Sequence, residues 1–403
     1  MKITHFEIMK VPPSWVWLRI HTDEGVSGLG EPYLESHPDS VIAEVRRIEP
    51  LLVGKDPRRI ESLWSTMYEA IWYYRGGPLT MSAIGGIDMA LWDLKGKAAG
   101  LPVYEMLGGP YQDRLRFYAN AGPGEPYFVE PGRPYREVSP DLSSAPSGPP
   151  RGLTNTNPAD WAAAARVWVD DWGFQALKFH FPLGPGLEVS QHVSTVTAIV
   201  GAVRDAVGDA VGLAVDMHHL HHNIAMQMND ALVPYRLLFV EDPQQIERMD
   251  VLRRIVESTS IPIAAGAAWM GKWIFQDALE AGLAVLQPDI THAGGITECK
   301  KIAAMAEAYY AKLALHCPNS IVALAASVQL HAAIPNFLVQ EQNPVNLYRE
   351  NGRVVWGKGY LKEPFVLDEE GFVPLPKGPG LGIELDEDGF REIMAMPWRE
   401  IRA

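Results

Sequence analysis

Eight short apolar runs, separated by segments with helical periodicity, follow residue 113 of this 403-residue chain. In the segments between the runs, apolar residues recur every three to four positions, which is typical of amphipathic helices. Strands that alternate with helices form parallel sheets, and eight such units close a (β/α)₈ barrel. The sequence therefore predicts an α/β fold with a barrel over residues 113–351. The expected strands are residues 115–119, 176–179, 212–215, 238–240, 262–265, 285–287, 313–315 and 337–339.

The residues on either side of the predicted barrel have a different pattern. Residues 15–22 alternate apolar and polar side chains before a turn sequence, which predicts a β-hairpin. Helical spacing over 40–52 and 82–98 predicts two helices in the same part of the chain. The C-terminal residues 352–403 return to hairpin-like sequence. We therefore expect a separate α+β module in which this C-terminal segment rejoins residues 1–112.

A long loop interrupts the predicted barrel after its first strand. Residues 122–157 contain eight prolines together with many Gly and Ser residues. A stretch of this length without regular structure is usually either functional or disordered. Because the loop leaves the C-terminal end of the barrel, where active sites lie, we expect either a lid over the substrate or a disordered insertion.

The charge balance excludes some classes of partner. The chain has 35 Lys and Arg against 49 Asp and Glu, a net charge of −14, which argues against nucleic acid or an anionic membrane surface as the main partner. The two cysteines, Cys299 and Cys317, form no motif of a disulfide framework or a thiolate zinc site. The first residues lack the apolar core of a signal peptide and no apolar run approaches about 18 residues, so we expect a cytoplasmic protein.

Polar side chains gather where the apolar runs end. In a barrel the carboxyl ends of all strands meet on one face, so residues that follow different strands converge there. Because side chains alternate along a strand, Lys178 and His180 point the same way, and carboxylates follow three other strands. The candidate site residues are Lys178, His180, Asp216, His218, Glu241, Asp289, His316 and Glu341.

The order of these motifs resembles the enolase superfamily, mandelate racemase subgroup, and within it the acid-sugar dehydratases such as galactonate and mannonate dehydratase. The similarity runs over nearly the whole chain. The spacing of 25 residues from Asp216 to Glu241, and of 26 residues from there to position 267, is similar to the rhythm of the family's magnesium ligands. The matching motifs are Lys178-x-His180, Asp216, Val240-Glu241-Asp242-Pro243, Gln287-Pro288-Asp289, Gly294-Gly295-Ile296-Thr297, His316-Cys317-Pro318 and Glu341.

The resemblance implies a magnesium-dependent dehydratase in which the α+β module, residues 1–112 and 352–403, is a capping domain that covers the barrel mouth. Asp216 and Glu241 would hold Mg²⁺. The ion would stabilise the enediolate that forms when the proton next to the substrate carboxylate is removed. Glu341 would hydrogen-bond the same enediolate.

The resemblance also assigns the acids and bases. His316 would be the base, oriented by Asp289, while Lys178 and His180 would face the opposite side of the substrate. In the dehydratases the residue two positions after the first metal ligand is a His that protonates the departing β-hydroxyl. His218 stands at that position and favours elimination of water to a 2-keto-3-deoxy acid.

The chain departs from the family pattern at the end of the fifth strand. The family's third metal ligand is a Glu after a Gly, but here Ala267 follows Gly266, and a methyl group coordinates no metal. Either the substrate carboxylate completes a weakened Mg²⁺ site, or Asp242, His218 or His292 replaces the missing ligand. The histidine tract 218–222 also suggests zinc, although no H-E-x-x-H helix accompanies it.

Three functions stay open at the level of the sequence. The first is the dehydratase acting on a small sugar acid, in a homo-oligomer as is usual for the family. The second is a racemase, epimerase or cycloisomerase that forms the same enediolate. The third is a barrel that only binds a ligand, although the polar residues retained at the strand ends argue against it.

Overall fold

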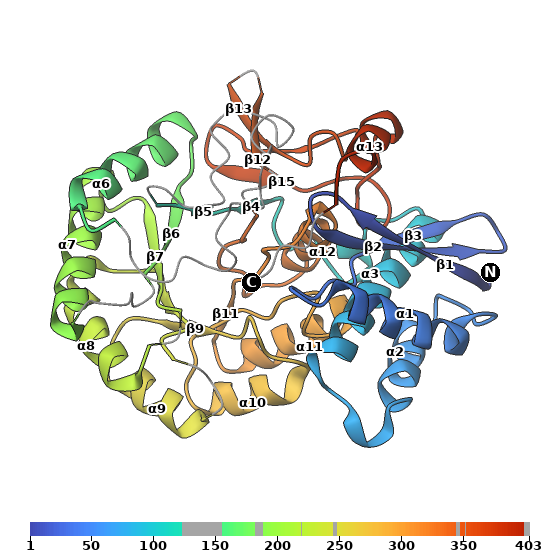
Figure 1. Cartoon of the computed structure of the whole chain (residues 1–403), viewed down its shortest axis with the longest axis horizontal. Helices are drawn as coiled ribbons and strands as arrows, with labels where there is room; N and C mark the ends of the chain where they lie inside the picture. Colours follow the sequence, from blue (N-terminus) through green and yellow to red (C-terminus); the bar gives the residue numbers. More distant parts are fainter. Residues whose placement is uncertain are drawn as a thin grey trace.

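The computed structural model describes residues 1–122, 155–181, 188–218, 220–244, 248–343, 347–350 and 352–398. Its centre is a parallel sheet of seven strands in the order β11-β10-β9-β8-β7-β6-β5, curled into a barrel (Figure 1). The eighth predicted strand closes the ring, because Phe337 bridges to Leu313 and Gln340 bridges to Phe117. The predicted α/β barrel is confirmed. Its strands are β5 (Ala119–Asn120), β6 (Ala176–His180), β7 (Gly212–Asp216), β8 (Phe239–Glu241), β9 (Ile263–Ala265), β10 (Val285–Leu286) and β11 (Lys312–Leu313).

The first predicted strand, residues 115–119, divides into two elements. β4 (Arg114–Arg116) pairs antiparallel with β15 (Phe372–Pro374), whereas Phe117 bridges to Gln340 and β5 pairs with β6 in the barrel. Leu115 is buried while Arg114 is exposed, and an antiparallel pair with one covered face suits that alternation. A continuous apolar run therefore serves two different sheets.

Helices surround the barrel and apolar side chains fill it. Asn157 caps the first of these helices, since its side chain accepts a hydrogen bond from the backbone N–H of Ala159. The filled interior is typical of a barrel core rather than a pore. The core residues are Tyr118, Ala176, Ala214, Phe239, Ala264, Val285, Ala314 and Val339. The helices are α6 (Pro158–Arg166), η2 (Val167–Asp171), α7 (Val189–Val207), α8 (His222–Leu232), η3 (Val233–Tyr235), α9 (Met249–Glu257), α10 (Lys272–Glu280), α11 (Gly295–Ala308) and α12 (Ile321–Ala332).

An antiparallel sheet and several helices lie beside the barrel and contact α11 and α12 (Figure 1). The predicted hairpin is present, because β2 and β3 pair antiparallel. The two predicted helices are slightly longer than expected, and the second ends at Gly100, whose φ of +69° suits the C-terminal cap. The elements are β1 (Ile3–Val11), β2 (Trp15–Thr22), β3 (Ser27–Gly30), α1 (Pro38–Leu52), α2 (Ile60–Glu69), η1 (Trp72–Tyr74), α3 (Pro78–Ala99) and α4 (Val103–Met106).

The C-terminal segment contacts the N-terminal strands. The Tyr360 hydroxyl donates to the carbonyl of Pro12 at 2.8 Å, and the Trp398 indole donates to that of Trp15 at 3.0 Å. The domain boundaries at 112 and 352 stay predictions. The elements of this segment are β12 (Leu347–Glu350), β13 (Arg353–Trp356), β14 (Phe365–Val366), β15 and α13 (Glu387–Met394).

Two sequence predictions concern the long loop and the membrane. Most of the loop 122–157 lies outside the described residues, so the choice between lid and disordered insertion is not addressed. Among the residues that are described, no helix combines the length and the apolar character needed to cross a bilayer.

Candidate active site

A row of polar side chains crosses the carboxyl ends of the barrel strands. His180 on β6 lies opposite Asp216 on β7 in the strand register, and Asp216 lies opposite Glu241 on β8. The next residue in the row, on β9, is Ala264. The convergence that the sequence predicted for these strand ends follows directly from this register.

Lys178 is buried between two carboxylates at this end of the barrel. Its side chain is 1% exposed, and Nζ lies 3.0 Å and 2.9 Å from the two carboxylate oxygens of Glu241 and 2.9 Å from Oε1 of Glu341. Gln287 donates to Glu241 at 2.8 Å, and the backbone N–H of Cys317 donates to Glu341 at 2.8 Å. One ammonium is therefore shared by two buried carboxylates.

The two carboxylates respond differently to this shared cation. Burial raises the pKa of Glu241 despite the neighbouring Lys178 charge. Burial acts in the same direction on Glu341, but the charges of Lys178 and His316 outweigh it and lower the pKa to about 2. Burial alone would lower the pKa of Lys178, yet the two carboxylates raise it well above its usual value. Lys178 therefore stays protonated and serves as a fixed positive charge.

His316 and Asp289 form the predicted dyad. Nδ1 of His316 lies 2.9 Å from Oδ2 of Asp289. Asp289 is fully buried and also accepts from the backbone N–H of Thr291 at 2.7 Å and from the side chain of Asn319 at 3.0 Å. Burial opposes the charged imidazole, but the Asp289 hydrogen bond and the charge of Glu341 outweigh burial and raise the pKa of His316 to about 9.

A second histidine behind the dyad was not recognised as paired from the sequence. Nε2 of His292 lies 3.1 Å from Oε2 of Glu35, and Nδ1 lies 2.9 Å from the Ser82 hydroxyl. Its Nε2 is also 4.0 Å from Asp289. Glu35 follows β3 and Ser82 lies on α3, so no local pattern linked them to a barrel loop. Both ring nitrogens of His292 therefore have other partners, and His292 does not take the place of the missing metal ligand.

A third group joins His180, Asp216 and His218. Oδ2 of Asp216 lies 3.1 Å from Nδ1 of His180 and 3.0 Å from Nε2 of His218, and the two nitrogens are 2.8 Å apart. Among the described residues, this trio has ligand atoms close enough to hold a metal ion. Burial would raise the pKa of Asp216, but the two imidazoles hold it well below the usual value. The Asp216 charge in turn raises the pKa of His218 to about 9.

The other suggested metal ligands do not join this trio. His221 and His222 pack against each other, with ring centroids 4.5 Å apart, and His219 lies outside the described residues. The described histidines of this tract therefore do not bind a metal together, since only His218 belongs to the trio. Burial and the charges of Glu241 and Asp216 raise the pKa of Asp242 well above its usual value, which favours a neutral acid over an anionic ligand.

Known proteins resemble this chain over almost its full length. Residues 9–108 match the N-terminal domain of the mandelate racemase / muconate lactonizing enzymes, and residues 160–389 match the enolase C-terminal domain-like family. The chain belongs to the mandelate racemase / muconate lactonizing enzyme family of the enolase superfamily. The resemblance read from the motifs is thereby confirmed.

Several proteins similar to this chain have assigned names or solved structures. Proteins named D-galactonate dehydratase from Ralstonia nicotianae and Variovorax paradoxus are each 40% identical to it over 390 residues, covering 96% of this chain and 93% of theirs. The crystal structure of a mandelate racemase/muconate lactonizing enzyme from Jannaschia sp. CCS1 covers 100% of both chains with a TM-score of 0.83 at 29% identity. Another, from Sulfitobacter sp., covers 99% of this chain and 96% of that one with a TM-score of 0.80 at 28% identity.

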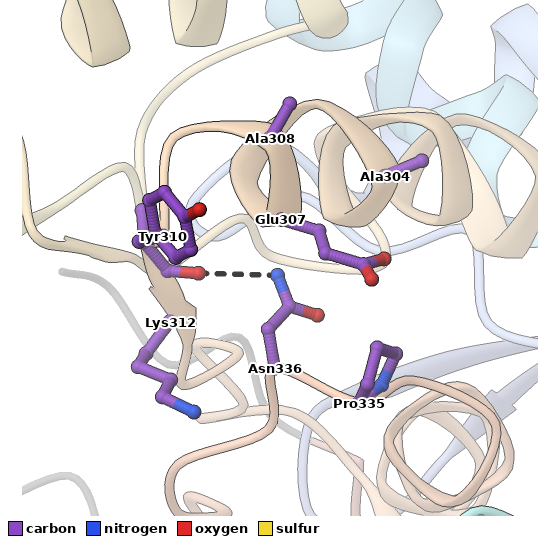
Figure 2. Close-up of a pocket in the computed structure, with 8 residues that line it drawn as sticks. Ala304, Glu307, Ala308, Tyr310, Lys312, Pro335 and Asn336 are labelled. Atoms are coloured by element: carbon purple, nitrogen blue, oxygen red, sulfur yellow. Dashed lines mark hydrogen bonds between the residues drawn. The ribbon is translucent and has the colours of Figure 1, made fainter.

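A cavity of about 600 Å³ lies near the amino end of strand β11. Figure 2 shows its lining at the C-terminal end of α11 and the start of β11, including Glu307, Tyr310 and Lys312. Asn336 donates to the carbonyl of Ala311 at 3.1 Å on its wall. Because the polar row occupies the opposite, carboxyl ends of the strands, this cavity is not the candidate active site.

Proposed function

We propose that this protein removes water from a sugar acid and releases a 2-keto-3-deoxy acid. The pairing of His316 with the buried Asp289 at the barrel mouth carries the proposal, because it supplies an oriented base. The relatives named D-galactonate dehydratase support the substrate class. The reaction requires a base, a cation for the substrate carboxylate and assistance to the departing hydroxyl.

His316 takes the proton from the carbon next to the carboxylate. Its Nδ1 is held by Asp289 at 2.9 Å, so Nε2 is the nitrogen that accepts the proton. The electron pair of the broken C–H bond moves toward the carboxylate and forms an enediolate. Asp289 stabilises the imidazolium that results, since it carries a negative charge beside it.

Lys178 stabilises the negative charge that develops on the substrate carboxylate. Its ammonium is already fixed by Glu241 and Glu341, so it needs little reorganisation when the enediolate forms. Glu341 is ionised in the free protein, and in this proposal it meets the enediolate through the Lys178 ammonium. Lys178 is bound too firmly as a cation to act as a second base.

His218 assists the departing hydroxyl. The enediolate electrons form a carbon–carbon double bond as the C–O bond at the β-carbon breaks, and the hydroxide leaves as water after gaining a proton. His218 would serve this step as the proton donor; if it also helped to hold a divalent cation, that cation would supply Lewis-acid assistance to the departing hydroxyl. Nδ1 of His180, on the neighbouring strand, lies 2.8 Å from Nε2 of His218, the nitrogen that also contacts Asp216. The enol product then tautomerises to the 2-keto acid.

Mg²⁺, which the family resemblance implies, prefers oxygen ligands in octahedral geometry. Asp216 supplies one, but both oxygens of Glu241 contact Lys178 and position 267 carries a methyl group. The nearest partners of Asp216 are instead two imidazole nitrogens. The residues present fit a cation that accepts nitrogen better than they fit Mg²⁺, so no step here passes through Mg²⁺.

The test is a screen of sugar acids, D-galactonate first, in which 2-keto acids are detected with semicarbazide after chelation and after addition of divalent cations. In D₂O, His316→Asn is expected to abolish exchange of the α-proton. His218→Asn is expected to keep that exchange and lose the elimination. His222→Asn, which lies outside the site, is the matched control and should behave as the parent.

Two outcomes would contradict the proposal. Full turnover by His316→Asn would remove its assignment as the base. Deuterium incorporation by the parent protein without formation of a 2-keto acid would indicate the racemase or epimerase reaction instead. The homo-oligomer stays a prediction, which a measurement of mass in solution addresses.

A further inference from the structure

Three donor atoms from two neighbouring strands converge at the barrel mouth. Nδ1 of His180, Oδ2 of Asp216 and Nε2 of His218 form a triangle with sides of 2.8, 3.0 and 3.1 Å. His180 and Asp216 end β6 and β7 in register, and His218 follows two residues later. The convergence is therefore built by the barrel rather than by one loop.

Protons alone leave one side of this triangle unsatisfied. If both nitrogens carry protons and donate to Asp216, two N–H groups face each other across the 2.8 Å between His180 and His218. If one proton lies between the nitrogens, the accepting nitrogen and the carboxylate oxygen meet lone pair to lone pair, at 3.0 or 3.1 Å. A cation at the centre would satisfy all three lone pairs together.

The dimensions of the triangle match one face of a metal octahedron. Metal–nitrogen and metal–oxygen bonds of about 2.1 Å place adjacent ligands about 3.0 Å apart in octahedral geometry. A tetrahedral ion with the same bond lengths would spread the ligand atoms to about 3.4 Å. The observed sides of 2.8 to 3.1 Å correspond to three adjacent octahedral positions.

The side chains are fixed on the protein side and open on the other. Oδ1 of Asp216 accepts the backbone N–H of His218 at 2.9 Å, which leaves Oδ2 directed at the two imidazoles. His218 adopts a left-handed backbone with φ of +45°, a conformation that costs energy and is found where function requires it. The Asp216 side chain is 7% exposed, whereas those of His180 and His218 are 20% and 32% exposed. Water or substrate oxygens have access to the remaining positions.

We propose that His180, Asp216 and His218 bind a divalent cation that favours nitrogen ligands, such as Fe²⁺, Co²⁺ or Zn²⁺, in preference to Mg²⁺. Two imidazoles and one carboxylate on one face are a set used for such ions, whereas Mg²⁺ favours oxygen. The set also replaces the donor lost at Ala267 with His180 and His218. The role of the ion in catalysis rests on the proposed function, but its binding does not and is tested without substrate.

The experiment titrates chelator-treated, full-length protein with Co²⁺ and with Mg²⁺, followed by calorimetry and by the visible absorption of bound Co²⁺. We expect one Co²⁺ per chain and at least about 100-fold weaker binding of Mg²⁺. His180→Ala and His218→Ala should each weaken Co²⁺ binding about 100-fold or more. His222→Ala removes an imidazole at the start of α8 and should leave binding unchanged, and Glu241→Gln should change it little.

A second measurement needs no variant. In protein labelled with ¹⁵N-histidine, Zn²⁺ is expected to shift the resonances of Nδ1 of His180 and Nε2 of His218, and to leave His222 unperturbed. Absence of Co²⁺ binding, Mg²⁺ binding as tight as that of Co²⁺, or loss of binding in Glu241→Gln but not in His180→Ala would each overturn the inference. Because none of these readouts involves turnover, they are distinguishable from a failure of the dehydratase proposal.

Discussion

His316 shows how much one residue depends on its neighbours. An isolated imidazole would be mostly neutral at pH 7. Asp289 and Glu341 raise the pKa of His316 to about 9, so the base of the free protein is largely protonated at neutral pH. A base must be neutral to accept a proton, which sets the direction of the pH dependence.

The first prediction concerns that pH dependence. We expect kcat/KM to fall about tenfold per pH unit as the pH drops below about 9, because only the neutral fraction of His316 is active. Asp289→Asn removes the partner that raises the pKa, so the midpoint should move to lower pH while the maximal rate decreases. Rates measured from pH 6 to about 10 test this. An unchanged midpoint in Asp289→Asn would contradict it.

The second prediction concerns the stability contributed by Lys178. Lys178→Met leaves Glu241 and Glu341 buried without their shared cation, and loss of one partner from a buried ion cluster costs about 3–5 kcal/mol. Urea unfolding followed by circular dichroism measures the change. Lys301→Met removes a cation paired with the exposed Glu61 and should cost less than about 1 kcal/mol. Equal losses in both variants would show that the burial of Lys178 carries no special stability.

At the scale of elements, the site is a property of strand ends. β6, β7 and β8 bring His180, Asp216 and Glu241 into one row through their parallel register. β9 continues the row, but residue 267 beyond its end has no donor atom. β9 is paired with β8, but the residue that would ligate the metal in the family is Ala267. Replacing Ala267 with Glu therefore tests whether this position belongs to the metal site.

The third prediction is that Ala267→Glu strengthens Mg²⁺ binding at least about tenfold, or about 1.4 kcal/mol. The new carboxylate would give Mg²⁺ a second anionic oxygen near Asp216 and move the site toward oxygen ligands. Ala268→Glu adds the same charge at the exposed neighbouring position and is the matched control. Calorimetric titration with Mg²⁺ compares the parent and both variants. A similar gain in Ala268→Glu would attribute the effect to general charge attraction.

At the scale of the whole molecule, buried carboxylates join the N-terminal elements to the barrel. Asp88 on α3 accepts from the backbone N–H and hydroxyl of Thr297 in the first turn of α11. Glu31, after β3, accepts from the backbone N–H groups of Ser320 and Ala323 at the start of α12. Helix N-termini attract negative charge, so these contacts orient the two units. The approach at α11 is close, since a Cβ on Gly295 would lie 2.3 Å from Oδ2 of Asp88.

The fourth prediction follows from the burial of these carboxylates. Burial, opposed by the hydrogen bonds they accept, raises the pKa of Asp88 and of Glu31 to about 7 each. A carboxyl group with a raised pKa in the folded state stabilises the fold most at low pH, and this contribution is lost as the pH rises through the folded pKa. For Glu31 the loss between pH 4.5 and 7 is on the order of 3 kcal/mol.

Urea unfolding of the parent, Asp88→Asn and Glu31→Gln between pH 4.5 and 7.5 measures this contribution. The difference in stability between parent and variant should shift in favour of each variant as the pH rises, because the amide has no charge to bury. A difference that stays constant with pH would show that these carboxylates ionise in the folded protein as easily as in the unfolded one.

The sequence indicated the barrel and the polar residues that gather at the ends of its strands. Apolar runs, helical periodicity and polar residues at the strand ends depend on local patterns, so they indicated the strands and placed Lys178, Asp216, Asp289, His316 and Glu341 on one face. The motif that marks the dyad is visible along the chain for the same reason. The sequence also showed that position 267 has no side chain able to ligate a metal.

Apart from the pairing of His316 with Asp289, the partners of these residues follow only from the tertiary structure. The pairing of Lys178 with two carboxylates, of His292 with Glu35, and of His180 with His218 each joins segments far apart in the chain. The division of residues 115–119 between two sheets also depended on where β15 lies. Local periodicity records which face of an element is buried, but not which distant side chain meets it there. A donor set is fixed by distances of about 3 Å, and only the packed fold sets those distances.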